Sequence, residues 1–204
     1  MKARLPGVWM VLGVAVMLSG CMGGASPPTR FFLLTAVEGA RGAAGTSVRR
    51  GPVVELEPVE IPRYLDRAEM VTRTGGNRLQ LDRLHQWGGD LREDIGRVLA
   101  ENLSALLASD RVVLLPTRGE GRADYRLAVT LSRFEPDAIS GEVLLDARWI
   151  LFDGRGREVE TRQARLVTRA GNREDFESLA VAMSEALGLL SRQLGESIRA
   201  RPAS

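Results

Sequence analysis

Cysteine and histidine each occur once in the 204 residues, as Cys21 and His85, and lysine does not occur after Lys2. A single cysteine excludes an intramolecular disulfide. A histidine-assisted serine nucleophile would have to use His85, but no G-x-S-x-G turn accompanies it. The missing lysine also excludes the G-K-[ST] phosphate loop, and no cluster of His, Cys and acidic residues has metal-ligand spacing. The sequence therefore predicts neither a cofactor nor a metal centre.

Acidic residues are plentiful, but their spacing does not suit acid–base catalysis. The adjacent pairs Glu93-Asp94 and Glu174-Asp175 fall in expected helical segments, where neighbouring side chains point in different directions. We interpret both pairs as solvated surface. His85 lies two residues before Trp87, and we expect it to cap or pack rather than to catalyse; Trp87 is expected in the core. We predict that the protein is not an enzyme.

The N-terminus is the most informative segment. Lys2 and Arg4 precede an apolar run over residues 8–18, and Leu18-Ser19-Gly20-Cys21 has small residues before a cysteine. A basic start, an apolar core and a small-residue cut form a secretory signal, and the run is too short for the ~20 residues of a spanning helix. We predict a lipoprotein signal peptide over residues 1–20 and a lipidated Cys21 that carries diacylglyceryl and N-acyl groups. Residues 21–30 should be a flexible tether, and 31–204 one periplasmic domain.

Cleavage changes the charge of the chain. Without Lys2 and Arg4 the mature chain has 26 arginines and 26 acidic residues. A net charge of zero gives no reason to expect nucleic acid as a partner. Bacterial lipoproteins retained in the inner membrane favour Asp after the cysteine, whereas Met22 follows Cys21 here. By that resemblance we expect an outer-membrane anchor on the periplasmic face.

Hydrophobic periodicity defines the elements of the domain. We expect strands at residues 31–34, 53–61, 112–115, 125–132, 143–152 and 158–169 and a hairpin over residues 69–81. In the second strand the apolar residues occupy even positions before Pro58 and odd positions after it. This change of face at a proline indicates a bulge or an edge position. Residues 143–152 are apolar on both parities, which predicts a central strand covered on both faces. Both expected helices have a single apolar stripe that a sheet can cover. The order of the elements therefore indicates an α/β domain with a mixed, largely antiparallel sheet and two long amphipathic helices packed on it.

Two segments have the helical period of three and four. One stripe runs over residues 91–107 and includes Asn102, which we expect to be buried and hydrogen-bonded. The second stripe runs from Phe176 to Ile198, with Asn172 as its expected cap.

Several short segments resemble one protein family: Ile61-Pro62-Arg63-Tyr64-Leu65-Asp66-Arg67, Met70-Val71-Thr72-Arg73, Leu79, Trp87 and residues 95–103. They are similar to the ABC-type transport auxiliary lipoproteins, of which paraquat-inducible protein C is the best-known type. Members of that family typically have Pro at the position of Ala68 and Ala-Glu-Pro at the position of Gly88-Gly89-Asp90.

The resemblance implies an outer-membrane lipoprotein that docks a mammalian-cell-entry-domain protein, itself served by an inner-membrane permease or ABC system that moves phospholipid between membranes. The implied chemistry is binding, and a homo-oligomeric ring is compatible with a multimeric partner. A different class stays open: a structural or pilot lipoprotein that stabilises another envelope assembly such as a secretin.

The segment 61–67 supplies the candidate partner contacts Arg63, Tyr64, Asp66 and Arg67, with Tyr64 and Arg67 preferred. An aromatic residue flanked by arginines is typical of interface anchors. An alternative interpretation is a strand end at which Asp66 pairs with Arg63 or Arg67.

Overall fold

The computed structural model describes residues 27–37, 51–116 and 122–201. The predicted lipidation site Cys21 and most of the predicted tether lie outside these residues. The elements in chain order are β1 (Arg30–Phe32), β2 (Val54–Leu56), β3 (Glu69–Gly75), β4 (Arg78–Trp87), α2 (Leu91–Leu106), β5 (Val112–Leu114), β6 (Tyr125–Pro136), β7 (Glu142–Asp153), β8 (Glu158–Arg169) and α3 (Phe176–Arg199).

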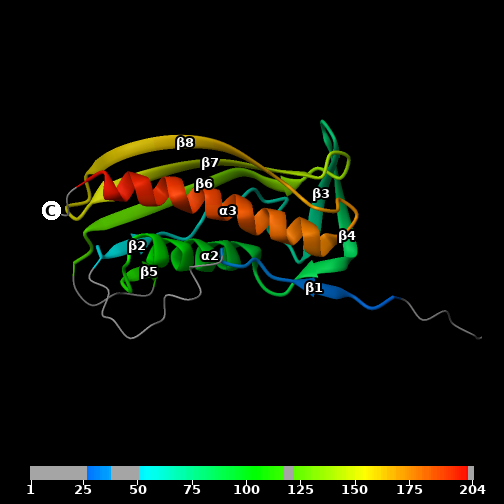
Figure 1. Cartoon of the computed structure of the whole chain (residues 1–204), viewed down its shortest axis with the longest axis horizontal. Coiled ribbons are helices and arrows are strands. Elements are labelled where there is room, and N and C mark those ends of the chain that lie inside the picture. Colours follow the sequence, from blue (N-terminus) through cyan, green and yellow to red (C-terminus); the bar gives the residue numbers. More distant parts are fainter. Residues whose placement is uncertain (1–26, 38–50, 117–121, 202–204) are drawn as a thin grey trace, which may run out of the picture.

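The larger sheet has five strands in the order β5-β2-β6-β7-β8. Its first three strands are parallel, and β6, β7 and β8 are antiparallel neighbours. Helices α2 and α3 lie side by side under one face of this sheet, and the long strands arch over α3 (Figure 1). The predicted fold class, two helices packed on mixed β-structure, is confirmed.

The remaining strands form a second, three-stranded sheet in the order β1-β4-β3. The predicted hairpin is present as β3 and β4, while β1 runs parallel to β4 and sets Phe31 beside Gln86. Phe32 of β1 lies 6.5 Å from the Phe176 ring, centroid to centroid, so this sheet adjoins the N-terminal end of α3.

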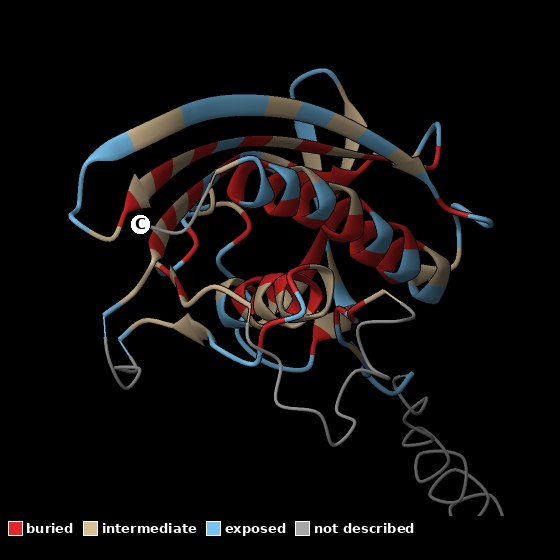
Figure 2. Ribbon diagram, turned by 60° about the vertical axis from the view of Figure 1, so that its left-hand side comes forward, coloured by how far each residue is buried: buried red, intermediate tan, exposed pale blue. Residues whose placement is uncertain are grey.

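A single cluster of buried apolar residues runs between the larger sheet and the helices. The alternation predicted for β6 is confirmed, since Tyr125, Leu127, Val129 and Leu131 are buried. Figure 2 shows the buried faces of both helices turned toward each other and toward the sheet. Burying each leucine of this cluster stabilises the fold by roughly 1.5–3 kcal/mol.

Strand β7 lies between β6 and β8, as predicted for a central strand, but the described chain does not cover it on both faces. Its odd-numbered residues from Val143 to Leu151 are buried, but the even-numbered ones are only half-buried and Arg148 is exposed. Both helices pack on the same face of the sheet, so no layer of the described chain covers the other face. One apolar residue of that face is covered by an arginine: the Arg126 guanidinium lies 4.8 Å from the Phe152 ring centroid.

Strand β2 is shorter than expected because the chain breaks its pairing at Pro58. Pairing with β6 resumes at Glu60, which accepts a hydrogen bond from Leu131 N–H and forms a bridge with Thr130. This is the predicted bulge. The edge position is excluded, because β2 lies between β5 and β6.

The helix starts are set by two aspartates. Asp90 accepts a hydrogen bond from the Glu93 N–H and caps α2. Asp175 caps α3 by accepting from Glu177 and Ser178 N–H, so the expectation of an Asn172 cap was wrong. Asn172 instead accepts from Glu174 N–H and closes the turn before the helix. Both residues suit a cap, and the side chain nearest the first helical turn takes the role.

Candidate functional site

Residues 61–67 form a tight turn rather than a strand end. Leu65 N–H donates to the Pro62 carbonyl and Asp66 N–H to the Arg63 carbonyl. Leu65 is buried at 2% exposure and plugs the turn into the core, while Arg63, Asp66 and Arg67 are exposed. The turn therefore displays three of the four predicted contact residues at the surface.

Asp66 pairs with a residue outside the turn. Its carboxylate lies 2.6 Å from Nη2 of Arg92, in the first turn of α2, so the suggested pairing with Arg63 or Arg67 was wrong. Both side chains are 41% exposed, and a bridge of this exposure contributes no more than about 1 kcal/mol. Its consequence is geometric: it fixes the turn against α2 and leaves both turn arginines without an ion pair in the described chain.

Tyr64 holds the turn from its other side. Its ring is half-buried, and its hydroxyl donates a 2.8 Å hydrogen bond to Oε2 of Glu135 on β6. The Glu135 side chain is fully buried, and Oε2 also accepts from the Phe134 N–H. The predicted contact residue Tyr64 thus presents its polar end to the interior of the protein.

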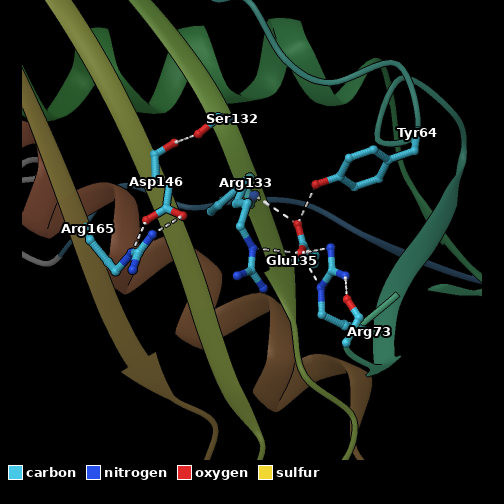
Figure 3. Close-up of polar contacts among 9 residues, drawn as sticks. Tyr64, Arg73, Ser132, Arg133, Glu135, Asp146 and Arg165 are labelled. Atoms are coloured by element: carbon cyan, nitrogen blue, oxygen red, sulfur yellow. Dashed lines mark hydrogen bonds and ion pairs between the residues drawn. The ribbon is translucent and has the colours of Figure 1, made fainter. Parts of the chain in front are cut away.

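Two arginines neutralise the buried carboxylate (Figure 3). Arg73 of β3 places Nη2 2.7 Å and Nε 2.8 Å from Oε1 of Glu135, and the Arg133 Nε lies 3.2 Å from the same oxygen. Arg73 also donates to the Gly76 carbonyl at the hairpin turn. We call Tyr64, Arg73, Arg133 and Glu135 the Glu135 network. It joins the turn, the smaller sheet and the larger sheet at one point.

The network raises the pKa of two of its members, Tyr64 and Arg73. Burial, followed by the hydrogen bond to Glu135, raises the pKa of Tyr64 well above its usual range. The hydrogen bond to Glu135 is the main reason that the pKa of Arg73 is also raised. Tyr64 is therefore a neutral donor at physiological pH, and the carboxylate of Glu135 has its oxygens occupied by donors. Such an arrangement positions a surface turn and offers no free nucleophile.

Two more polar contacts in Figure 3 lie on the uncovered face of the larger sheet. Arg165 of β8 donates from Nε, at 2.7 Å, and from Nη2, at 3.3 Å, to the two carboxylate oxygens of Asp146 on β7. The Ser132 hydroxyl donates to the Asp146 carbonyl across the β6 bulge. Cross-strand pairs of this kind stabilise a solvated sheet face.

The histidine and tryptophan have packing roles, as expected. The His85 ring stacks on Phe176 with centroids 3.9 Å apart, and its Nδ1 lies 2.8 Å from Asp82. Trp87 is buried at 5% exposure.

Within the described ranges, no group of three or more His, Cys, Asp or Glu side chains is placed to hold a metal ion. No helix there is long and apolar enough to span a membrane.

Arg63, Asp66 and Arg67 lie at the surface, but Tyr64, expected to be an exposed aromatic, is half-buried. Glu135, Arg73 and Arg92 were not predicted from the sequence as part of the site. The alternation that marks β6 could have drawn attention to Glu135, because it continues past Ser132 toward Pro136 after a bulge. Nothing local to Arg73 or Arg92 indicates their partners, which lie 62 and 26 residues away.

Two solved structures share this fold at low sequence identity, and a third is more distantly similar. An uncharacterized protein superposes with a TM-score of 0.68 at 17% identity, over 84% of this chain and 99% of its own. A Xanthomonas campestris protein gives 0.62 at 17% identity, over 84% of this chain and 91% of its own. PelC from Paraburkholderia phytofirmans, solved as a dodecamer, gives 0.43 at 16% identity, over 72% and 94%.

No curated protein matches the sequence. A family model does, and it spans residues 32–195, from β1 through most of α3. The match includes the turn at residues 61–67 and every member of the Glu135 network. The chain belongs to the family described as the ABC-type transport auxiliary lipoprotein component.

Proposed function

We propose that this protein is an outer-membrane lipoprotein that acts as a non-enzymatic accessory component of an intermembrane phospholipid transport system. In that role it docks a mammalian-cell-entry-domain partner at the periplasmic face of the membrane. The observation that carries the proposal is the family match over residues 32–195. The signal-peptide motif Leu18-Ser19-Gly20-Cys21 supports a lipid anchor on Cys21, and Met22 supports an outer-membrane location.

The turn at residues 61–67 is the proposed docking element. The Asp66–Arg92 ion pair holds it on one side, and the Tyr64–Glu135 hydrogen bond holds it on the other. A surface that is ordered before binding loses less conformational entropy when a partner arrives. The turn thereby offers Arg63 and Arg67 in a defined position.

The chemistry of the turn favours a partner with carboxylates. Arg63 and Arg67 are exposed. A guanidinium presents a planar pair of donors that fits a carboxylate bidentately. Tyr64 contributes by fixing the backbone between them, and its ring edge can still contact a partner because it is only half-buried.

Cross-linking in intact envelopes, followed by mass spectrometric identification of the captured protein, tests the proposed partner. We expect a protein with a mammalian-cell-entry domain. Capture of a secretin or of another structural envelope assembly would instead establish the pilot-lipoprotein alternative and contradict lipid transport.

The docking element is tested with the double variant Arg63→Glu and Arg67→Glu. Reversal of both charges should reduce the captured partner by at least tenfold. Both residues are exposed, so the fold should be retained. Arg192→Glu, at an exposed position of α3, is the matched control and should leave capture unchanged. Full capture of the partner by the folded double variant would show that the turn is not part of the interface.

A further inference from the structure

Exposed apolar side chains gather on the smaller sheet. Seven large hydrophobic residues of the described chain are exposed, and four of them belong to β1, its continuation and β4: Phe31, Leu33, Leu81 and Leu84. We call these four the β1–β4 apolar set. Phe31 and Leu33 are the most exposed of the four, at 65% and 58%. Scattered exposed leucines are common, but a concentration on two hydrogen-bonded strands indicates a contact surface.

The alternation of the chain makes this exposure systematic. Phe32 packs against the core and Leu34 is fully buried, so Phe31 and Leu33 point to the opposite side. Leu33 lies over Gly88, where an added Cβ would be 3.1 Å from its Cδ2 atom. The segment is held in place by the Leu34 N–H, which donates to Asp94 of α2 at 2.7 Å. A well-anchored strand therefore presents a phenylalanine and a leucine outward.

Charged residues of both signs lie beside the apolar set: arginines belong to β1 and β4, and Glu174, Asp175 and Glu177 line one hollow together with Arg30 and Phe31. Strands β1 and β4 together carry three arginines, Arg30, Arg78 and Arg83, and one acidic residue, Asp82. Asp82 is engaged by His85. Apolar side chains with neighbouring guanidinium groups match the boundary between acyl chains and phosphate headgroups.

The covalent path to the predicted lipid limits where this surface can be. Phe31 lies ten positions after Cys21, and a chain of ten residues spans at most roughly 33–36 Å. Helix α3, with 24 residues, is about 36 Å long. It runs from Phe176, beside Phe32, to the β7–β8 end of the molecule, where Arg201 bonds to the Val159 carbonyl. The covalent path thus enters the described domain at β1 of the smaller sheet, at the opposite end of α3 from the β7–β8 turn (Figure 1).

We propose that the β1–β4 apolar set rests on the membrane that holds the lipid of Cys21, with Phe31 and Leu33 at the boundary between headgroups and acyl chains. This inference rests on the lipid anchor of the proposed function. A short covalent tether raises the effective concentration of the surface at that membrane above that of any untethered partner. The contact gives the domain a fixed orientation, with the β7–β8 turn directed away from the bilayer.

The lipidated chain itself allows a specific test, because acylation consumes its only cysteine. Phe31→Cys, Leu84→Cys and Arg155→Cys each introduce one reactive thiol for an environment-sensitive fluorophore. Arg155 is an exposed residue of the β7–β8 turn and serves as the control. The proteins are reconstituted in vesicles of phosphatidylethanolamine and phosphatidylglycerol that contain lipids with a quencher in the acyl chain. Labels at positions 31 and 84 should be quenched several-fold more than the label at 155.

A second comparison separates the native side chains from the label. Phe31→Asp with Leu33→Asp, in the Leu84→Cys background, should abolish the excess quenching at position 84. Val181→Asp, at an exposed position of α3, should leave it unchanged. Equal quenching at 84 and 155 in a protein with a lipid mass on Cys21 would overturn the inference alone. A mature chain whose Cys21 carries no lipid mass would contradict the proposed lipid anchor, and with it this inference.

Discussion

The Tyr64 hydroxyl lies 2.8 Å from Oε2 of Glu135, and this hydrogen bond joins residues 71 positions apart. It connects an exposed turn to the most buried carboxylate of the described chain. Glu135 is fully buried and is bound by two arginines from different sheets. The orientation of the proposed docking turn is therefore set by a contact in the interior.

Removal of the buried carboxylate should be costly. Glu135→Ala leaves Arg73, Arg133 and the Tyr64 hydroxyl without their common acceptor, and we expect the free energy of unfolding to fall by about 3 kcal/mol. Urea denaturation measures this change. Glu135→Gln retains the shape and one acceptor and should cost about half as much. Equal stability of Glu135→Ala and the wild type would show that the network does not join the sheets.

The tyrosine contact predicts a dependence on alkaline pH. Because the pKa of Tyr64 is higher in the folded protein than its usual value of 10.0, its contribution is complete below pH 10. It is lost as the pH rises above 10, where the unfolded chain ionises first. Tyr64→Phe should be less stable than the wild type by about 1 kcal/mol near neutral pH.

Denaturation at about pH 8 and about pH 11 compares the two proteins, and the difference in stability should shrink at the higher pH. Tyr125→Phe, at the chain's other tyrosine, should show the same trend, because burial also raises the pKa of Tyr125. A stability difference between Tyr64→Phe and the wild type that stays constant over this range would contradict the assigned role of the hydroxyl.

Periodic elements were predictable because their pattern is local. The apolar stripe of α2, the alternation of β6 and the β3–β4 hairpin all follow from side chains that recur at the period of the element. The burial of Asn102 was also predictable, since it lies within the stripe. The coverage of β7 on both faces was predicted wrongly, because apolar residues at both odd and even positions do not show whether a second layer exists to cover them.

The site was predictable only in part, for a similar reason. The segment 61–67 is recognisable by its family pattern, but its conformation depends on contacts from distant elements. Neither Asp66 nor Tyr64 has a local partner: one binds Arg92 and the other Glu135. Local sequence offered Arg63 and Arg67 as closer candidates for Asp66, and tertiary packing selected another arginine.

Asn102 should be important for packing of the two helices. Its side chain is fully buried, accepts from Val37 N–H at 3.1 Å and donates to the Ser191 hydroxyl at 3.2 Å. Asn102→Leu removes both contacts and leaves the Val37 N–H without its acceptor, and it should reduce the free energy of unfolding by about 2–3 kcal/mol. Ser191→Ala removes only the second contact and should cost about 1 kcal/mol. Thermal unfolding of both variants measures the difference, and a Ser191 loss as large as the Asn102 loss would refute this assignment.

The cap of α3 predicts a dependence on acidic pH. Hydrogen bonds from Ser178 lower the pKa of Asp175 below its usual value of 3.8. Its contribution is therefore complete above that value and is lost as the pH falls through the lowered pKa. Asp175→Ala should be destabilised at neutral pH, and the difference from wild type should narrow in acid. Asn172→Ala, the control, should destabilise the protein less at neutral pH. A larger destabilisation by Asn172→Ala than by Asp175→Ala would show that Asn172 is the cap.

Two glycines of α3 should respond to alanine in opposite directions. A Cβ at Gly188 would overlap with Cγ1 of Val37, whereas one at Gly195 would have its nearest neighbour, Cβ of Leu106, at 3.6 Å. Alanine in a helix interior gains about 0.8–1 kcal/mol over glycine. Gly195→Ala should therefore raise the free energy of unfolding by up to about 1 kcal/mol, while at Gly188 the steric overlap outweighs this gain and stability should fall by about 1–2 kcal/mol. Chemical denaturation of the two single variants measures both signs. Stabilisation by Gly188→Ala would show that the segment around Val37 does not pack against α3 as described.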